Sequence, residues 1–438
     1  MEGEQINGGS VKTVPLLVNI NEEKHIHEGD QFCDERGEDG HLVSDTSFFK
    51  TCFNGLNALS GVGILSVPYA LSSGGWLSLI LLFIIAILTF YTGLLMKRCM
   101  DMDPDIKSYP DIGEHAFGKT GRTIVSITMH LELYMVATGF LILEGDNLHK
   151  LLPDMSIEII NGFNIGGTRS FVIIVGLIIL PTVWLDNMNI LSYISATGVI
   201  SSMVLLVSVF WAGTFDGIGF HNKGRLINWK GLPTAVSLYA FCFCAHPVFP
   251  TLYTSMRIQK QFSQVLQVCF LISTFSYALM AVLGYLMFGS DLTSQITLNL
   301  PTDSINSKVA IYTTLINPIA KYALMVTPML DSFEARFISQ RPYRRLLSLV
   351  IRTTLVASTI VVALSLPFFG QLMSLVGAFL SITGSVLLPC FCFLKISGIY
   401  ESIGLELIFI CCILLMGLII MIVGTYVALM DIMVNLSQ

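Results

Sequence analysis

The sequence predicts an all-α polytopic membrane protein with about eleven transmembrane helices. Of its 438 residues, 53% are hydrophobic and only 12% are charged, whereas a soluble domain carries roughly 25% charged residues. Long apolar runs recur along the chain, as at 77–96 and 407–430. These runs are continuous rather than alternating, which favours helices over a β-barrel.

Each expected span is long enough to cross a hydrocarbon core of roughly 30 Å. In chain order the spans cover residues 48–73, 76–96, 122–148, 169–185, 188–213, 232–256, 261–288, 306–335, 344–366, 369–394 and 403–431. The stretch 104–121 is too polar to span and contains several prolines and glycines, so we expect a short interfacial helix there. The sequence thus predicts one transmembrane domain over 48–438.

The first 47 residues differ from the rest of the chain in charge. They hold eleven acidic and three basic residues, a net charge of −8, whereas the remainder carries +2. Because this segment is also polar, rich in glycine and poor in aromatic residues, we expect a disordered acidic tail. It has no apolar core of a signal peptide, and its acidity argues against a nucleic-acid partner.

The distribution of lysine and arginine predicts the orientation of the chain. If the acidic tail is cytosolic, twelve basic residues outside the tail lie on the cytosolic side and six lie on the opposite side. This asymmetry favours a cytosolic N-terminus. With an odd number of spans, the C-terminus then lies on the far face, which is the lumenal face in an organelle.

Two interruptions of the apolar spans are the most informative feature of the sequence. The first span contains Gly61, Gly63 and Pro68, and the sixth span contains Pro247 and Pro250. Such residues weaken or break the helical hydrogen-bond ladder, and backbone freed inside lipid must line a cavity or be buried in protein. Matched breaks predict a five-plus-five inverted repeat, with repeats at 48–213 and 232–394, an extra helix at 403–431 and a midplane binding site.

The two breaks offer groups that match a zwitterionic amino acid. Free N–H groups near residues 62–64 would bind a carboxylate, and unwound carbonyls would accept hydrogen bonds from an ammonium. The alternative is that glycine and proline are simply common in membrane helices and that the nearby aromatic residues only pack. The expected substrate-binding residues are Asn57, Ser60, Gly61, Val62, Gly63, Tyr134, Phe243 and His246.

Ionisable residues inside membrane spans are costly and point to function. Lys321 lies near the middle of the eighth span, Glu132 lies in the third, and His246 lies in the break of the sixth. These three residues are the candidates for proton coupling, and an imidazole titrates near about 6.5. The alternative for each is a structural hydrogen bond. Glu144 and Asp146 lie closer to the end of the third span, where we expect an interfacial or gating role.

Several long stretches resemble the amino acid/auxin permease family, and specifically its plant vacuolar amino-acid transporter branch. The same family contains the vesicular inhibitory amino-acid transporter. The resemblance runs from about residue 48 to the C-terminus and leaves out the acidic tail. The matching stretches are FNGLNALSGVGILSVPYAL at 53–71, SYPDIGEHAFGKTGR at 108–122, LILEGDNL at 141–148, VFPTLYTSM at 248–256, LGYLMFGS at 283–290 and NPIAKYALMVTPM at 317–329.

The resemblance implies the eleven-helix inverted-repeat fold and proton-coupled amino-acid transport without sodium. In such a fold the eighth span packs against the first break, where sodium-coupled relatives hold a cation. We therefore expect the Lys321 ammonium to occupy that cation position, accepted by carbonyls of the break. The sequence departs from the family pattern at Pro247, where a small residue is usual, and at Gly139, where relatives carry a glutamate.

The expected function is secondary active transport of neutral amino acids across the vacuolar membrane, by proton antiport and alternating access. The expected partners are an amino-acid substrate and membrane lipid, with the proton as coupling ion and no other cofactor. Two alternatives are a plasma-membrane proton/amino-acid symporter and a membrane sensor that signals through its tail. We expect no enzyme and no metal site, because the chain has no His-Glu-x-x-His motif and its ten cysteines lack zinc-site spacing.

Overall fold

The computed structural model describes residues 46–154, 157–159, 163–165, 167–184, 188–337, 343–401 and 404–437. Within these ranges, ten helical segments are long and apolar enough to cross a membrane, and one bent helix pair makes an eleventh. The chain is therefore an integral multi-pass membrane protein, and the predicted all-α polytopic class is confirmed. Nearly all of the predicted acidic tail, residues 1–45, lies outside the described residues.

The first half of the chain contributes five spans. The first span is the bent pair α1 and α2, and a short antiparallel hairpin that pairs Ile157 with Ile165 lies between the third and fourth spans. The elements are α1 (Phe48–Leu59), α2 (Gly63–Gly74), α3 (Ser78–Met102), α4 (Tyr109–Leu151), β1 (Ile157–Ile159), β2 (Phe163–Ile165), α5 (Gly167–Trp184) and α6 (Met188–Phe215).

The second half contributes five further spans, and one more helix follows. The sixth span is interrupted and the tenth changes helical form along its length. The elements are α7 (Leu232–Cys242), η1 (His246–Val248), α8 (Phe249–Ser255), α9 (Phe262–Phe288), η4 (Ile296–Leu298), α10 (Ile305–Phe337), α11 (Arg344–Ser365), α12 (Phe369–Leu375), η5 (Val376–Ser381), η6 (Thr383–Leu387), α13 (Leu388–Ser397) and α14 (Leu405–Ser437).

The start of α4 shows how local sequence sets a helix boundary. The Ser108 hydroxyl accepts from the Asp111 N–H, and the Asp111 carboxylate accepts from the Ser108 N–H at 2.9 Å. This capping box begins the helix. Phe117 and Gly118 then leave helical geometry, with Gly118 at φ 64°, where only glycine is relaxed. The residues before this kink form the short helix predicted within 104–121.

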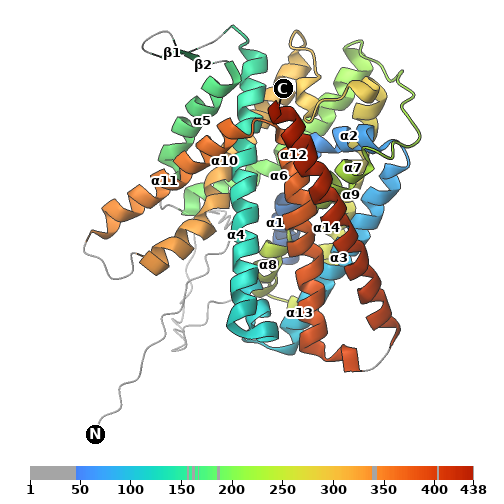
Figure 1. Ribbon diagram of the computed structural model, residues 1–438, viewed down its shortest axis with the longest axis vertical. Helices are drawn as coiled ribbons and strands as arrows, with labels where there is room; N and C mark the ends of the chain where they lie inside the picture. Colours follow the sequence, from blue (N-terminus) through green and yellow to red (C-terminus); the bar gives the residue numbers. More distant parts are fainter. Residues whose placement is uncertain are drawn as a thin grey trace, which may run out of the picture.

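The two interrupted spans lie together inside the bundle. α2 packs against α7 and α9, while α10 packs against α6 and α4. Figure 1 shows α4 running through the height of the molecule, with the β1–β2 hairpin and the C-terminal end of α14 both near its upper end. The outer face of α14 exposes apolar side chains such as Leu415 and Ile422, as expected for a surface in contact with lipid.

Hydrogen bonds to backbone carbonyls join the spans on both sides of the membrane. On the side where α1 begins, the Thr46 N–H donates to the Ser255 carbonyl at 3.1 Å, and the Arg257 N–H donates to the Thr46 carbonyl at 3.2 Å. We call this contact the Thr46 bridge. On the opposite side, the Lys150 ammonium donates to three carbonyls of the segment before α10, and we call this contact the Lys150 clamp. Its acceptors are the carbonyls of Thr297, Leu298 and Leu300.

Candidate functional site

The first span breaks where glycines were predicted to weaken it. α1 ends at Leu59, α2 starts at Gly63, and the two helices meet at a bend of 52°. Gly63 also allows close packing, because a Cβ there would lie 3.2 Å from the Cα of Cys242 at the end of α7. Pro68 does not contribute to the break as expected. It lies inside α2, which continues to Gly74.

The sixth span breaks beside the first. α7 ends at Cys242, and a short turn containing His246 and Pro247 separates it from α8. Tyr277 of α9 connects the two breaks: its hydroxyl donates to the Leu59 carbonyl and lies 3.3 Å from the Cys242 carbonyl. Both carbonyls lie at helix ends, where intrahelical donors are missing. Tyr277 was not predicted as a site residue, because a tyrosine in an apolar run is expected to serve packing.

Lys321 of α10 meets the end of α1. Its ammonium donates to the Ser60 carbonyl at 2.9 Å and to the Asn57 carbonyl at 3.3 Å, and the residue is only 5% exposed. The last carbonyls of a helix lack donors and carry the negative end of the helix dipole, so they suit a cation. The structure thus places the ammonium at the carbonyls of the first break, where the sequence led us to expect it. We call Asn57, Ser60 and Lys321 the cation centre.

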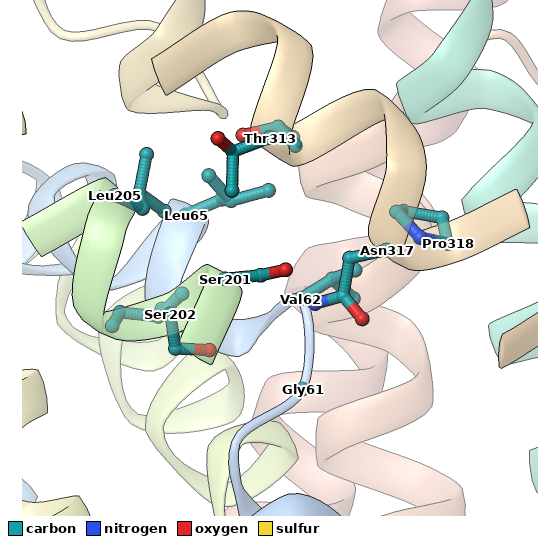
Figure 2. A pocket seen from close by; sticks show the side chains of 11 residues that line it. Gly61, Val62, Leu65, Ser201, Ser202, Leu205, Thr313, Asn317 and Pro318 are labelled. Atoms are coloured by element: carbon teal, nitrogen blue, oxygen red, sulfur yellow. The ribbon is translucent and has the colours of Figure 1, made fainter. Parts of the chain in front are cut away.

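A pocket lies beside the cation centre, between the first break, α6 and α10. Figure 2 shows the Ser201 hydroxyl pointing toward Val62 and the Asn317 amide across this space. Gly61 and Val62 were predicted from the sequence, whereas the residues from α6 and α10 were not. The lining residues are Gly61, Val62, Ile64, Leu65, Ser201, Ser202, Leu205, Thr313, Thr314, Asn317 and Pro318.

The pocket combines polar groups with an apolar wall. The first turn of α2 leaves N–H groups without intrahelical acceptors, and α6 and α10 add hydroxyls and the Asn317 amide. The side-chain oxygen of Asn317, Oδ1, has no hydrogen-bond partner within the described chain. None of the residues that line the pocket is ionisable. The lining therefore offers hydrogen-bonding groups and apolar surface, and no counter-ion for a charged side chain.

Glu132 of α4 lies on the other side of the breaks, next to the sixth span. It is 4% exposed, and its carboxyl accepts a hydrogen bond from the Ser381 hydroxyl at 2.6 Å. The Cys244 thiol, from the break of the sixth span, also lies within hydrogen-bonding reach of this carboxyl. Glu132, Cys244 and Ser381 therefore join α4, the sixth span and the tenth span. We call these three residues the carboxyl centre.

His246 is fully buried in the second break, and its Nε2 meets the Thr92 hydroxyl. The Thr92 hydroxyl can donate its single hydrogen to a carbonyl, that of Ser385 at 2.7 Å or that of Thr89 at 3.0 Å. In that arrangement the hydroxyl accepts from His246 Nε2, which lies 2.9 Å away, and Nε2 carries the hydrogen; in the other tautomer Nε2 accepts from the hydroxyl. The other ring nitrogen, Nδ1, is buried without a partner in the described part of the chain.

The remaining predicted residues do not line the pocket. The Tyr134 hydroxyl donates to Ser358 of α11 at 3.0 Å, away from the pocket. Phe243 is fully buried and stacks on Phe270, with ring centroids 5.9 Å apart. Asp146 accepts from Gln295 at 2.9 Å near the Lys150 clamp. Glu144 is fully buried, and neither carboxyl oxygen has a partner among the residues that the structure describes.

Comparisons with known proteins agree with a transporter architecture. The family model described as transmembrane amino acid transporter protein matches residues 44–430. The chain is 59% identical to amino acid transporter AVT1J of Arabidopsis thaliana over 93% of this chain and 96% of that protein. It is 43% identical to amino acid transporter AVT1B of the same plant, over 97% and 80% of the two chains.

A more distant relative is the vesicular GABA transporter of Caenorhabditis elegans, which is 25% identical over 81% of this chain and 73% of that protein. The plant relatives and the worm protein are all named as transporters. The family match covers most of the chain, including both breaks, the pocket and the Lys321 position. The chain therefore belongs to the transmembrane amino acid transporter family.

Proposed function

We propose that this amino-acid transporter moves neutral amino acids across the vacuolar membrane in exchange for protons, without sodium. The contact between the Lys321 ammonium and the Ser60 and Asn57 carbonyls carries this proposal. The Lys321 ammonium, which is covalently part of the chain, would take the place of a bound sodium ion, because carbonyls at the first break accept from it as they would coordinate the ion. The vacuolar location is supported by the resemblance to the plant vacuolar branch, and the cytosolic N-terminus by the distribution of lysine and arginine.

The pocket supports a neutral substrate. A zwitterion's carboxylate would be bound by the free N–H groups at the start of α2, and its side chain would lie among Leu65, Leu205 and the hydroxyls of α6. A charged side chain would find no counter-ion among the residues that line this space. Glu132 and His246 are the proposed proton sites, because both are buried beside the second break and both can accept a proton.

Alternating access would move the spans that contain the breaks. We propose that spans one, two, six and seven rock against spans three, four, eight and nine around the two breaks. Tyr277 holds the ends of α1 and α7 together, so the breaks would bend as a coupled pair. The Thr46 bridge and the Lys150 clamp lie on opposite sides of the membrane, where such a motion would close one side while the other opens.

The test is uptake into proteoliposomes of a panel of labelled amino acids in sodium-free buffer, with and without an imposed pH gradient. Neutral amino acids should accumulate, and accumulation should collapse when the gradient is removed. Tight binding of an amino acid without gradient-dependent flux would overturn the transporter mechanism and favour a sensor. Accumulation driven by a sodium gradient instead would overturn the role proposed for Lys321.

Lys321→Ala supplies a sharper test of the cation centre. Removing the ammonium leaves buried carbonyls without a donor, so uptake should fall about tenfold or more, since a hydrogen bond from a charged group contributes about 1.5–3 kcal/mol. Added sodium should restore part of that uptake if a cation is what the carbonyls require. Lys308→Met is the matched control, because Lys308 is an exposed lysine on the same helix. Normal sodium-free uptake by Lys321→Ala would contradict the proposal.

A further inference from the structure

The tenth span contains a stretch that is not α-helical. Between α12 and α13, the segments η5 (Val376–Ser381) and η6 (Thr383–Leu387) are π-helical. A π-helix closes its hydrogen bonds between residues i and i+5, and it is found mostly as short insertions inside α-helices, frequently at functional sites. We call residues 376–387 the π stretch.

Pro389 explains why carbonyls of the π stretch lack helical donors. Proline has no N–H to donate. In α-helical register, residue 389 would donate to the Ser385 carbonyl, and in π-helical register it would donate to the Gly384 carbonyl. One of these two carbonyls therefore loses its donor in either register.

Hydroxyls from two other spans take the place of that donor. Tyr109 of α4 donates to the Gly384 carbonyl at 2.5 Å, and Thr92 of α3 donates to the Ser385 carbonyl at 2.7 Å. Tyr109 and Thr92 are both buried. Because a hydroxyl lies within hydrogen-bonding distance of each carbonyl, an external donor is at hand for whichever carbonyl has lost its helical donor. The π stretch is thus built so that either register is available to it.

The π stretch also connects the carboxyl centre to the half-helix α7. On one face, the Ser381 hydroxyl donates to Glu132 Oε1 at 2.6 Å. On another face, Gly377 lies against α7 so closely that a Cβ there would be 1.9 Å from the Ser237 carbonyl oxygen. A change of register in this stretch would therefore move the surface on which α7 rests.

Protonation of Glu132 would change what the Ser381 hydroxyl can do. An ionised carboxylate only accepts, so the Ser381 hydrogen must point to it. A protonated carboxyl can donate its hydrogen to Ser381 Oγ, and the serine hydrogen is then free to turn to a carbonyl of its own helix, as Thr383 does with Phe379. Such back-bonding alters and bends the helical ladder.

Few other ionisable groups surround Glu132. The Cys244 thiol of the sixth span is in reach of the carboxyl, and the Tyr109 phenol at the start of α4 lies nearby. The imidazole of His246 does not bond to Glu132 directly. It contacts the Thr92 hydroxyl, which in turn lies against the Ser385 carbonyl of the π stretch. His130 of the same helix bonds to Ser332 of α10. The salt bridges in the described part of the chain do not include Glu132.

We propose, on the basis of the proton-coupled function above, that Ser381 is a positioning residue for Glu132 and that the π stretch changes register when Glu132 gains or loses a proton. The change of register shifts α7 and so reaches the break of the sixth span. Ser381 does not itself carry the proton. It converts the state of the Glu132 carboxyl into a change in the hydrogen-bond ladder of the tenth span.

The test compares two serines of the π stretch in proteoliposomes, with labelled alanine and the amino acid that the wild type accumulates most. Counterflow is measured with equal pH on both sides, from about pH 5 to pH 8, and accumulation is measured under a pH gradient. Ser381→Ala should displace or flatten the pH profile of counterflow and lower gradient-driven accumulation about tenfold. Ser381→Thr, which keeps the hydroxyl, should restore both.

Ser385→Ala is the matched control, because the Ser385 hydroxyl has no partner within the described chain while its backbone carbonyl still accepts from Thr92. It should keep the wild-type pH profile. The same pH profile in Ser381→Ala and Ser385→Ala would overturn the proposal. A wild type that never accumulates substrate under a pH gradient would instead overturn the proposed function, before any variant is measured.

A second measurement does not depend on the folding of Ser381→Ala. Hydrogen–deuterium exchange of peptides that cover residues 376–387 is compared between the wild type and Glu132→Gln, whose amide imitates the neutral carboxyl. The proposal expects different protection of this stretch in the two proteins, with unchanged protection of α14 as the internal reference. Equal protection of residues 376–387 would overturn it.

Discussion

Gly61 and Gly63 are two residues apart, yet a methyl group would meet different surroundings at each. A Cβ on Gly63 would lie 2.8 Å from Cys242 Sγ and 3.2 Å from Cys242 Cα, whereas a Cβ on Gly61 would have no atom within 4 Å. Gly63→Ala should therefore destabilise the protein by about 1–3 kcal/mol, the usual effect of overpacking. Thermal unfolding in detergent, compared with the wild type, measures this.

Gly61→Ala is the matched variant and should leave the unfolding temperature close to that of the wild type. Because Gly61 lines the pocket, its new methyl group should narrow the space for the ligand and raise the substrate concentration needed for half-maximal counterflow. Equal unfolding temperatures for Gly63→Ala and Gly61→Ala would contradict the close approach of α2 to α7.

The Tyr277 hydroxyl should be needed for transport, although the residue lies in an apolar run of the sequence. Tyr277→Phe removes the hydroxyl that bridges the carbonyls of Leu59 and Cys242. The Leu59 carbonyl keeps the Gly61 N–H as donor, but the Cys242 carbonyl loses the Tyr277 hydroxyl, and leaving a buried acceptor unsatisfied costs about 1–3 kcal/mol. Transport should fall about tenfold, because the ends of the two half-helices are no longer joined. Counterflow measures the effect. Tyr239→Phe is the control, since that buried hydroxyl meets Ser78, and a similar loss there would argue for a general packing effect.

At the scale of single residues, sequence reasoning located some of the site and missed the rest. Lys321 was singled out because a charged residue in an apolar span is costly, and the family resemblance implied that its span packs against the break of the first. Ser201, Thr313 and Asn317 were not predicted, because small polar residues are common in membrane helices and nothing local shows which side of a helix faces the pocket. That information depends on how α6 and α10 rotate against the first break.

At the scale of elements, the Lys150 clamp joins the end of the third span, α4, to the segment that precedes α10. Its ammonium is held by carbonyls of Thr297 and its neighbours, so Lys150→Met should free this segment. A cysteine introduced as Thr297→Cys should then react about tenfold faster with a membrane-impermeant maleimide, as expected when hydrogen bonds to a charged group are lost. Adding Lys308→Met to the same Thr297→Cys background is the control and should leave the labelling rate unchanged.

Element boundaries were predicted well because hydrophobic length determines them. The expected spans at 261–288 and 344–366 correspond to α9 (Phe262–Phe288) and α11 (Arg344–Ser365). The π stretch was not predicted, although Pro389 marks the carbonyls that lose a donor. The sequence alone does not show that hydroxyls from Thr92 and Tyr109 reach those carbonyls, because their separation along the chain is large and only the packed bundle brings them together.

At the scale of the whole molecule, the Thr46 bridge joins the start of the first span to the end of the sixth. Thr46→Pro removes the N–H that donates to Ser255, whereas Thr46→Ala keeps both backbone bonds. A backbone hydrogen bond contributes about 0.5–1.5 kcal/mol, so counterflow by Thr46→Pro should differ from the wild type several-fold. Thr46→Ala should match the wild type, and an equal effect of both variants would assign the change to the side chain.

The Thr46 bridge has a counterpart on the opposite face of the membrane, so backbone hydrogen bonds join the first and sixth spans at both of their ends. On its side, the first and sixth spans are joined into a single lever, because Thr46 before α1 forms an isolated β-bridge with Met256 after α8. At the opposite end of these spans, the Asn228 N–H donates to the Gly74 carbonyl of α2 at 2.9 Å, and the N–H groups of Trp76 and Leu77 donate to the carbonyls of Arg225 and Leu226, just before α7, at 3.0 Å. Residues 1–45 are attached directly to this lever, so a protein or a modification that pulls on them would pull on the sixth span as well.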